Sequence, residues 1–363
     1  MSVIENVKLN NGDKVFLFFT FPYSFEKLPL EMIKGVELIC LPNRGFLDKD
    51  DQEAYSYALP PISLSGFGVP QTSIRITSEH KNQRELFWQT IFAIRLIKSL
   101  KIGTSGYLTY KHNNSIAIDD PCGLIWRYTV INCSSDKYVN DDFKNAGELL
   151  KKIITLKKTK DCNRFINALN IFSEVANGNS TSYGMNFLSL FNCLEGLFIS
   201  KSDSSKGTLL SQRVNSFVGK FFPDIEVKYF IKREYNRRNA LTHGGTSFWI
   251  STKTRKLDTS VSKENYSILL NLYEITRLSI LGFLGLTPDE LKKYSSIREE
   301  EKGLEDALRE ILKGEKNLKE NRKKIIKDKI KKVTKKLDSF FVDVAANPIE
   351  ERIYLEIPDY DFK

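Results

Sequence analysis

The longest apolar stretch of this chain, residues 268–286, constrains the fold more than any other feature. Glu274 and Arg277 interrupt it, and ionised side chains are rare in the interior of a membrane-spanning helix. The stretch therefore predicts a helix buried in a protein core, and we expect no membrane partner.

Helical periodicity is present from residue 141 onward, and linkers rich in Ser, Asn and Gly separate the periodic segments. The expected helices span residues 141–158, 162–177, 183–200, 207–220, 224–243 and 261–286. A further helix is expected to start at Pro288, with Thr287 as its N-cap. The sequence thus predicts a helical-bundle domain over residues 140–290.

Residues 1–135 have a different pattern. Short segments rich in β-branched or aromatic residues are bounded by turn residues, as expected for strands, at 15–21, 36–41, 73–77 and 126–131. Residues 84–100 between them have helical periodicity. We predict a mainly α protein with a small N-terminal α+β module, which serves target sensing, placement of the substrate or structural support.

The C-terminal part of the chain is strongly basic. Between Arg309 and Lys336 there are thirteen Lys or Arg residues against four Asp or Glu, and the whole chain has a net charge of +10. Apolar residues recur in helical steps up to Ile325, and the pattern continues one position out of register from Ile326. We predict one long basic amphipathic helix over 297–341 and a C-terminal extension over 342–363. Its basic face either keeps the protein soluble or attracts a phosphate backbone.

Length and rare residues limit the function classes. A chain of 363 residues is expected to hold about two domains. Its three histidines are scattered, and its five cysteines form no CxxC or other metal-ligand spacing. An odd number of cysteines fits a reducing compartment. We therefore expect a cytoplasmic protein with no metal site and no cofactor.

One short motif has the residue types of a phosphodiester-cleaving site. Arg238, Asn239 and His243 lie near the end of the helix expected at 224–243, just before Gly244 and Gly245. Imidazole titrates near neutral pH and transfers protons, and guanidinium offers a permanently charged donor fork that fits a phosphate. The alternative is an ordinary helix C-terminus, since glycine and a nearby cation are common there.

Residues 235–245 resemble the signature of HEPN domains, and specifically the Apea-like HEPN group, in which an Arg precedes a His near a helix end. Residues 187–198, with the embedded Glu195, are similar to the apolar helix of that family, and Arg277 matches a recurring arginine of its last helix. The similarity covers about residues 180–286. It is this combination of segments that makes the resemblance specific.

The resemblance implies an all-helical domain whose active members are metal-independent endoribonucleases acting as dimers. Arg238 would bind the scissile phosphate, His243 would act as general acid or base for attack by the ribose 2′-hydroxyl, and Asn239 would orient the imidazole or a phosphate oxygen. The expected products are a 2′,3′-cyclic phosphate and a 5′-hydroxyl, and the requirement for a 2′-hydroxyl confines cleavage to RNA. We expect auxiliary roles for Glu195, Tyr235 and Arg237.

The same resemblance predicts a homodimer that acts on RNA in a toxin or antiviral defence role, with an antitoxin or regulatory partner. HEPN domains that only bind RNA or assemble proteins also exist. The alternative function is therefore a non-catalytic RNA-binding or dimerisation module.

Overall fold

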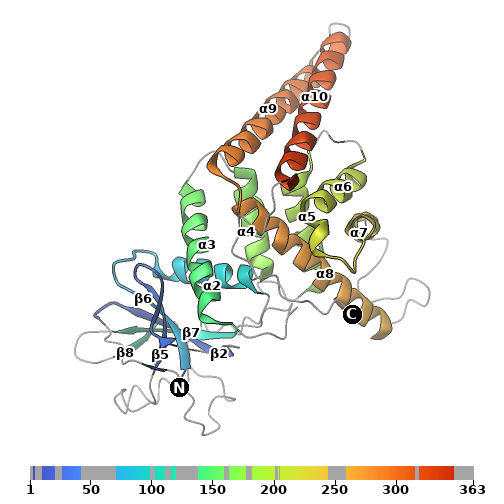
Figure 1. Cartoon of the computed structure of the whole chain (residues 1–363). Helices are drawn as coiled ribbons and strands as arrows, with labels where there is room; N and C mark the ends of the chain where they lie inside the picture. The colour runs from blue at the N-terminus through green and yellow to red at the C-terminus, as the bar shows by residue number, and fades with distance from the viewer. Residues whose placement is uncertain are drawn as a thin grey trace. The chain divides into compact units, whose positions relative to one another are not determined.

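The structure is a computed structural model of the chain (Figure 1). It describes residues 3–4, 10–20, 27–41, 71–98, 103–110, 116–119, 138–158, 163–176, 182–200, 203, 205–243, 259–314 and 319–346. The chain forms two compact units. The first contains the sheet, α2 and most of α3, and the second contains most of α4 and the helices α5 to α10. The protein is thus mainly helical with an N-terminal antiparallel sheet, as predicted.

The described residues of the first unit include a six-stranded antiparallel sheet with the order β4-β5-β6-β2-β7-β8. Its strands are β2 (Lys14–Thr20), β4 (Leu30–Ile33), β5 (Val36–Leu41), β6 (Gln71–Ile76), β7 (Gly103–Tyr110) and β8 (Ile116–Asp119). A separate parallel pair joins β1 (Val3–Ile4) to β3 (Lys27–Leu28). The strands predicted at 15–21, 36–41 and 73–77 are confirmed.

Apolar side chains on one sheet face bury the helix α2 (Gln83–Ile97). Phe16 lies opposite Ile74 in the register of β2 and β6, and its ring stacks on Phe87 of α2 at 4.0 Å. The helix α3 (Asn140–Lys158) also belongs mainly to this unit. It approaches β4 closely at Gly147, where an added Cβ would lie 2.1 Å from the carbonyl oxygen of Met32. Only glycine fits at this contact between helix and strand.

The second unit is a helical bundle. Its helices include α4 (Asn163–Ala176), α5 (Tyr183–Phe198), α6 (Lys206–Val218), α7 (Val227–Thr242) and α8 (Thr259–Leu284), each within about three residues of its predicted bounds. A short 3-10 turn, η5 (Gly219–Phe221), follows α6. Among the described helices α8 alone is long and apolar enough to cross a membrane, over Asn265–Leu284, and 83% of that window is buried in the structure. Arg277 forms an ion pair with Glu274 at 2.8 Å inside α8, as expected of a buried core helix.

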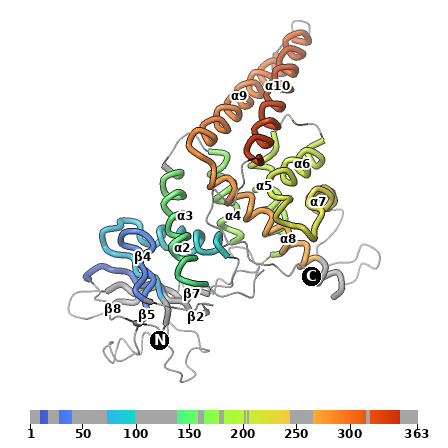
Figure 2. The backbone as a smooth tube through the Cα atoms, in the orientation of Figure 1, coloured from blue at the N-terminus to red at the C-terminus, as the bar shows by residue number. Residues whose placement is uncertain are grey.

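The predicted single helix over 297–341 is wrong. Two antiparallel helices, α9 (Pro288–Lys313) and α10 (Lys319–Ala346), form a hairpin instead, as Figures 1 and 2 show. The change of register near Ile325 reflects this chain reversal, because Gly314 ends α9 and the apolar residues of α10 face back toward α9. Thr287 caps α9 as predicted, in a capping box with Glu290.

Aromatic residues anchor the base of the hairpin in the bundle. The ring of Phe341 in α10 lies 4.9 Å from that of Phe198 in α5, and Tyr294 of α9 lies 5.2 Å from Phe283 of α8. Arg213 of α6 adds an ion pair to Asp338 of α10 at 2.6 Å. The hairpin is therefore part of the helical unit rather than a separate C-terminal helix.

Three sequence predictions lie outside the described residues. These are the strand at 126–131, the end of the motif at Gly244 and Gly245, and the extension beyond residue 346.

Candidate functional site

The helix α7 carries the predicted motif and is held by one buried stripe. Val227, Phe230, Ile231 and Tyr235 are buried along it, and α7 packs on α6 and α5. The polar residues of the motif follow in its last two turns, where Arg238 and Asn239 are half-buried and His243 is exposed. The buried stripe therefore sets the orientation of the motif relative to α5.

Arg238 is held against α5. Its Nη2 atom lies 3.2 Å from Oε2 of Glu195 and 3.3 Å from Oδ1 of Asn192. Its guanidinium also lies 5.7 Å from the centre of the Tyr235 ring. The side chain keeps 21% of its surface exposed, so an anionic ligand can reach it.

Glu195 has a second partner on α7. The hydroxyl of Tyr235 donates to Oε1 of Glu195 at 2.7 Å, while Oε2 accepts from Arg238. Burial, and then the hydrogen bond to Glu195, raise the pKa of Tyr235 to about 12. Tyr235 therefore stays a neutral donor at physiological pH and fixes the carboxylate that faces Arg238.

Gly207 of α6 makes room for this arrangement. An added Cβ at Gly207 would lie 2.6 Å from Cδ1 of Tyr235, and that ring is buried. The close approach of α6 to α7 thus sets the position of the Tyr235 hydroxyl.

Asn239 and His243 lie next to Arg238 along the chain but have different contacts. Oδ1 of Asn239 accepts from Nη1 of Arg238 at 3.2 Å, and the backbone N–H of His243 donates to the carbonyl of Asn239 at 3.1 Å. Within the described part of the chain, the imidazole of His243 has no hydrogen-bond partner. Asn239 therefore contacts the guanidinium here, whereas we predicted that it would orient the imidazole or a phosphate oxygen.

Arg238 and His243 do not contact each other within the described residues of one chain. Their spacing of five residues places them about 140° apart around a helix with 3.6 residues per turn. Arg238 faces α5, and His243 lies exposed at the end of α7. A substrate that contacts Arg238 and His243 of the same chain would therefore have to reach both the side of α7 that faces α5 and the end of α7.

Arg237, a predicted auxiliary residue, has structural partners. Its Nη1 donates to Oδ1 of Asn265 in α8 at 2.6 Å, and its Nε lies 3.4 Å from the buried carboxylate of Glu234. Arg233 pairs with the same carboxylate at 2.6 Å. Arg237 thus connects α7 to α8 and stands apart from the cluster around Glu195.

The exposed face of α7 leads to His243. Its exposed residues include Tyr229, Lys232, Asn236 and His243. Steps of three or four residues connect them, with Asn239 or Ala240 between Asn236 and His243, so they lie on one side of the helix. Tyr229 is 62% exposed, which is unusual for a tyrosine ring. This face carries an aromatic ring and a cation about 21 and 16 Å along the helix from His243.

The sequence analysis missed Asn192. It lies three residues before Glu195 on α5, so both side chains point from one helix face toward Arg238. That spacing was the available signal. Within the described residues, no group of three or more His, Cys, Asp or Glu side chains is placed to hold a metal ion.

Comparisons with known proteins give no relative on which to base an assignment, since no family model, curated protein or solved structure matches this chain significantly.

Proposed function

We propose that this protein is a metal-independent endoribonuclease of the HEPN type. Arg238 binds and neutralises the scissile phosphate. His243 either accepts the proton of the attacking ribose 2′-hydroxyl as general base or donates a proton to the leaving 5′-oxygen as general acid. Asn239, which already contacts Arg238, is a further ligand for a phosphate oxygen. The products are a 2′,3′-cyclic phosphate and a 5′-hydroxyl.

One observation carries this proposal. Arg238 is held by a carboxylate, an amide and an aromatic ring while part of its surface is open, and an exposed imidazole ends the same helix. Such an arrangement fixes a phosphate-binding cation in advance, which is how electrostatic stabilisation of a transition state operates. Glu195 and Tyr235 support Arg238, and the contacts of Arg237 give it a structural role.

A homodimer is part of the proposal because one chain leaves Arg238 and His243 without contact. Pairing two copies would allow the arginine of one protomer to act with the histidine of its partner. Mixing the Arg238→Ala and His243→Ala proteins tests this arrangement. Activity regained on mixing supports a site shared between two chains. If mixing restores no activity, Arg238 and His243 of each site belong to the same chain.

We place the activity in the cytoplasm, in a toxin or antiviral defence role under control of an antitoxin or regulatory partner. Growth inhibition on expression, relieved by His243→Ala, supports that role.

A second candidate is a non-catalytic RNA-binding or dimerisation module. The direct pairing of Arg238 with Glu195 favours it, because an arginine neutralised by a carboxylate also serves a purely structural purpose. Only the nuclease predicts cyclic-phosphate products.

The deciding experiment compares cleavage rates of purified variants. We expect His243→Ala and Arg238→Ala each to lower the rate by about 10²- to 10⁴-fold. Two matched controls lie in the first unit. His80 uses Nε2 to contact the carbonyl of Lys34, and Arg84 is exposed on α2. His80→Ala and Arg84→Ala should cleave at the wild-type rate, and cleavage that survives loss of His243 or Arg238 contradicts the assigned roles.

A further inference from the structure

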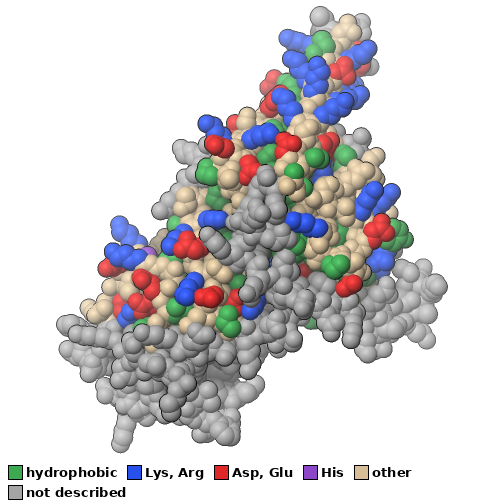
Figure 3. Space-filling view, viewed as in Figure 1, with side chains coloured by type: hydrophobic (Ala, Val, Ile, Leu, Met, Phe, Trp, Pro, Cys, Tyr) green, Lys and Arg blue, Asp and Glu red, His purple; other side chains and the backbone are tan. Residues whose placement is uncertain are grey.

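The two helices of the hairpin carry opposite charge. The helix α10 has ten Lys or Arg residues against four Asp or Glu, and all ten cations lie in residues 319–336. The helix α9 has six Lys or Arg against eight Asp or Glu. The positive charge of the C-terminal region therefore belongs to α10, and Figure 3 shows Lys and Arg side chains gathered on the hairpin.

Few of these cations are neutralised. Lys336 pairs with Glu300 of α9 at 2.8 Å, and Lys323 pairs with Glu320 at 3.4 Å. Lys324, Lys327, Lys331 and Lys335 are exposed, and within the described residues no carboxylate lies within ion-pairing distance of any of the four.

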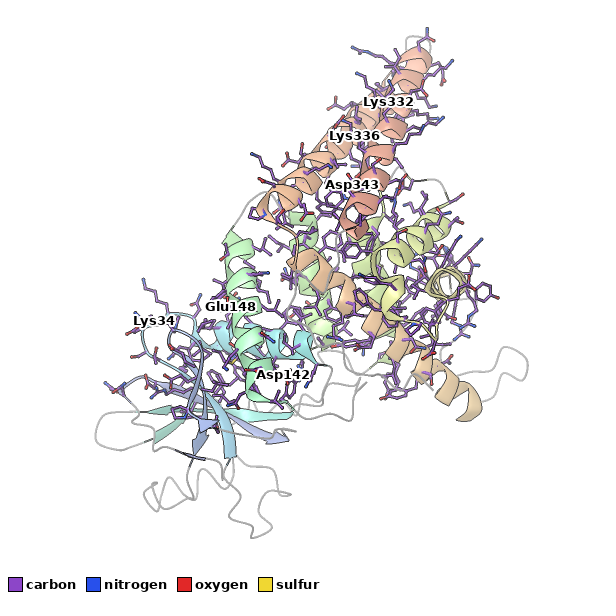
Figure 4. All side chains as sticks on the ribbon, viewed as in Figure 1. Lys34, Asp142, Glu148, Lys332, Lys336 and Asp343 are labelled. Atoms are coloured by element: carbon purple, nitrogen blue, oxygen red, sulfur yellow. The ribbon has the colours of Figure 1, made fainter. Side chains whose placement is uncertain are left out.

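These four lysines, here called the α10 lysine face, follow one another in steps of three and four residues. They therefore lie along one side of the helix, over a length of about 16 Å. Figure 4 labels two other lysines of the same helix, Lys332 and Lys336. The result is a face with roughly one lysine per helical turn and one exposed carboxylate, Asp328, between Lys327 and Lys331.

From Ile330 onward, another side of α10 is used in packing. Ile330, Val333, Leu337, Phe340 and Phe341 are buried. Because these side chains face α9 and the bundle, the lysine face must point away from the body of the hairpin. Anchoring by the aromatic residues at the base of the hairpin keeps that orientation fixed.

The character of the surface identifies the ligand class. A helix that binds at a membrane surface inserts a continuous apolar face between the lipids. The apolar stripe of α10 from Ile330 to Val344 is already buried in the protein, and the exposed Ile325 and Val342 lie seventeen residues apart and form no such face. Evenly spaced lysines without aromatic or arginine anchors suit a regular polyanion, whose charges repeat along its length.

We propose that the α10 lysine face binds the phosphate backbone of RNA, away from the cleavage site and without sequence preference. This inference rests on the proposed function, since it supplies the nuclease with a second contact on its substrate. Of the two interpretations of the basic segment, it adopts phosphate binding.

The test measures binding of a labelled single-stranded RNA to the His243→Ala protein, so that the probe stays uncut, at several salt concentrations. Changing all four lysines to Gln should make the slope of log K against log salt less steep by about 2 to 3. It should weaken binding at 0.15 M salt by about 10- to 100-fold. The corresponding Lys→Arg variant should bind like the parent.

A control removes the same charge from exposed positions on another helix. Lys144, Lys151, Lys152 and Lys157 are exposed on α3, and their change to Gln should leave the slope unaltered. Equal effects of the two quadruple variants would overturn the proposal, because only net charge would then matter. Loss of binding to vesicles of anionic lipid, with RNA binding unchanged, would overturn it in favour of a membrane.

The two proposals fail in different ways. If the wild-type protein leaves RNA uncut but its binding of RNA still depends on the α10 lysine face, only the proposed nuclease activity is contradicted. If the protein cleaves RNA but changing these lysines leaves RNA binding unaltered, only the proposed role of the α10 lysine face is contradicted.

Discussion

Replacing Arg298 by Met should destabilise the helical unit, because this buried arginine joins the hairpin to the end of α5. Its Nη2 donates to the carbonyl of Leu197 at 2.6 Å, and its Nη1 donates to Ile199 at 3.3 Å and to Glu301 at 3.1 Å. Cations at a helix C-terminus also interact favourably with the helix dipole. Methionine keeps the apolar stem of the side chain and removes only the charge and the donors.

The magnitude follows from what remains after the substitution. Breaking a buried ion pair by removing one partner costs about 3–5 kcal/mol. Arg164, however, still donates to Ile199 at 2.7 Å and lies 3.4 Å from Glu301, and Tyr294 still donates to Leu197 at 2.8 Å. Each group that loses Arg298 thus keeps one donor, so we expect a loss of about 2–3 kcal/mol.

Removing Arg164 as well should cost more than the sum of the two single changes. Glu301 would then be buried without a cation, and residues that share a partner couple by about 1–3 kcal/mol. Arg309→Met is the control on the same helix, because Arg309 is exposed and lies 3.7 Å from Asp306. It should change stability by less than about 0.5 kcal/mol.

Hydrogen exchange of the α5 and α9 peptides measures these free energies for the helical unit alone. Protection that falls equally in Arg298→Met and Arg309→Met, or a double variant that is simply additive, would refute the role assigned to Arg298.

Three further predictions concern α5, α6 and α7. Because the pKa of Tyr235 is raised to about 12, the neutral hydroxyl stabilises the folded state fully below pH 10, and this stabilisation is lost between about pH 10 and 12. In urea titrations, the difference in unfolding free energy between wild type and Tyr235→Phe should therefore shrink over that range. A difference that stays constant contradicts this prediction. Gly207→Ala should push the Tyr235 ring away from Glu195 and lower the unfolding free energy by about 1–2 kcal/mol, although alanine has the better helix propensity. An unchanged urea midpoint would exclude the close contact between residue 207 and the Tyr235 ring. Burial raises the pKa of Cys193, whose Sγ donates to the carbonyl of Ala168, so peptide mapping should find Cys193 unlabelled by iodoacetamide until the protein unfolds.

Local patterns predicted the helices well because each has its own apolar periodicity. The apolar segments at 183–200 and 261–286 became α5 and α8 with small changes at their ends. The strands β7 and β8 were not predicted. The segment of β7 is rich in Gly, Ser and Thr, and it forms a strand through pairing with the distant β2.

The hairpin was missed for a different reason. A heptad pattern continues through Leu318 toward Ile325, and it does not distinguish a helix with a register shift from two helices that fold back on each other. Gly314 was the one local signal for a break.

At the site, the sequence identified Arg238, Glu195 and Tyr235, which the structure brings together. The partners of Asn239 and the contribution of Asn192 depend on how α5 and α7 pack, and one helix pattern alone does not contain that information. The separation of Arg238 from His243 around α7 was predictable from their spacing.

The most direct test of the central claim is the chemistry of the ends produced from RNA in the presence of a chelator. Wild-type protein should give 2′,3′-cyclic phosphates and 5′-hydroxyls, and the His243→Ala protein should give none. Cleavage that stops on adding the chelator, or fragments that carry 5′-phosphates, would contradict a metal-independent reaction at Arg238 and His243.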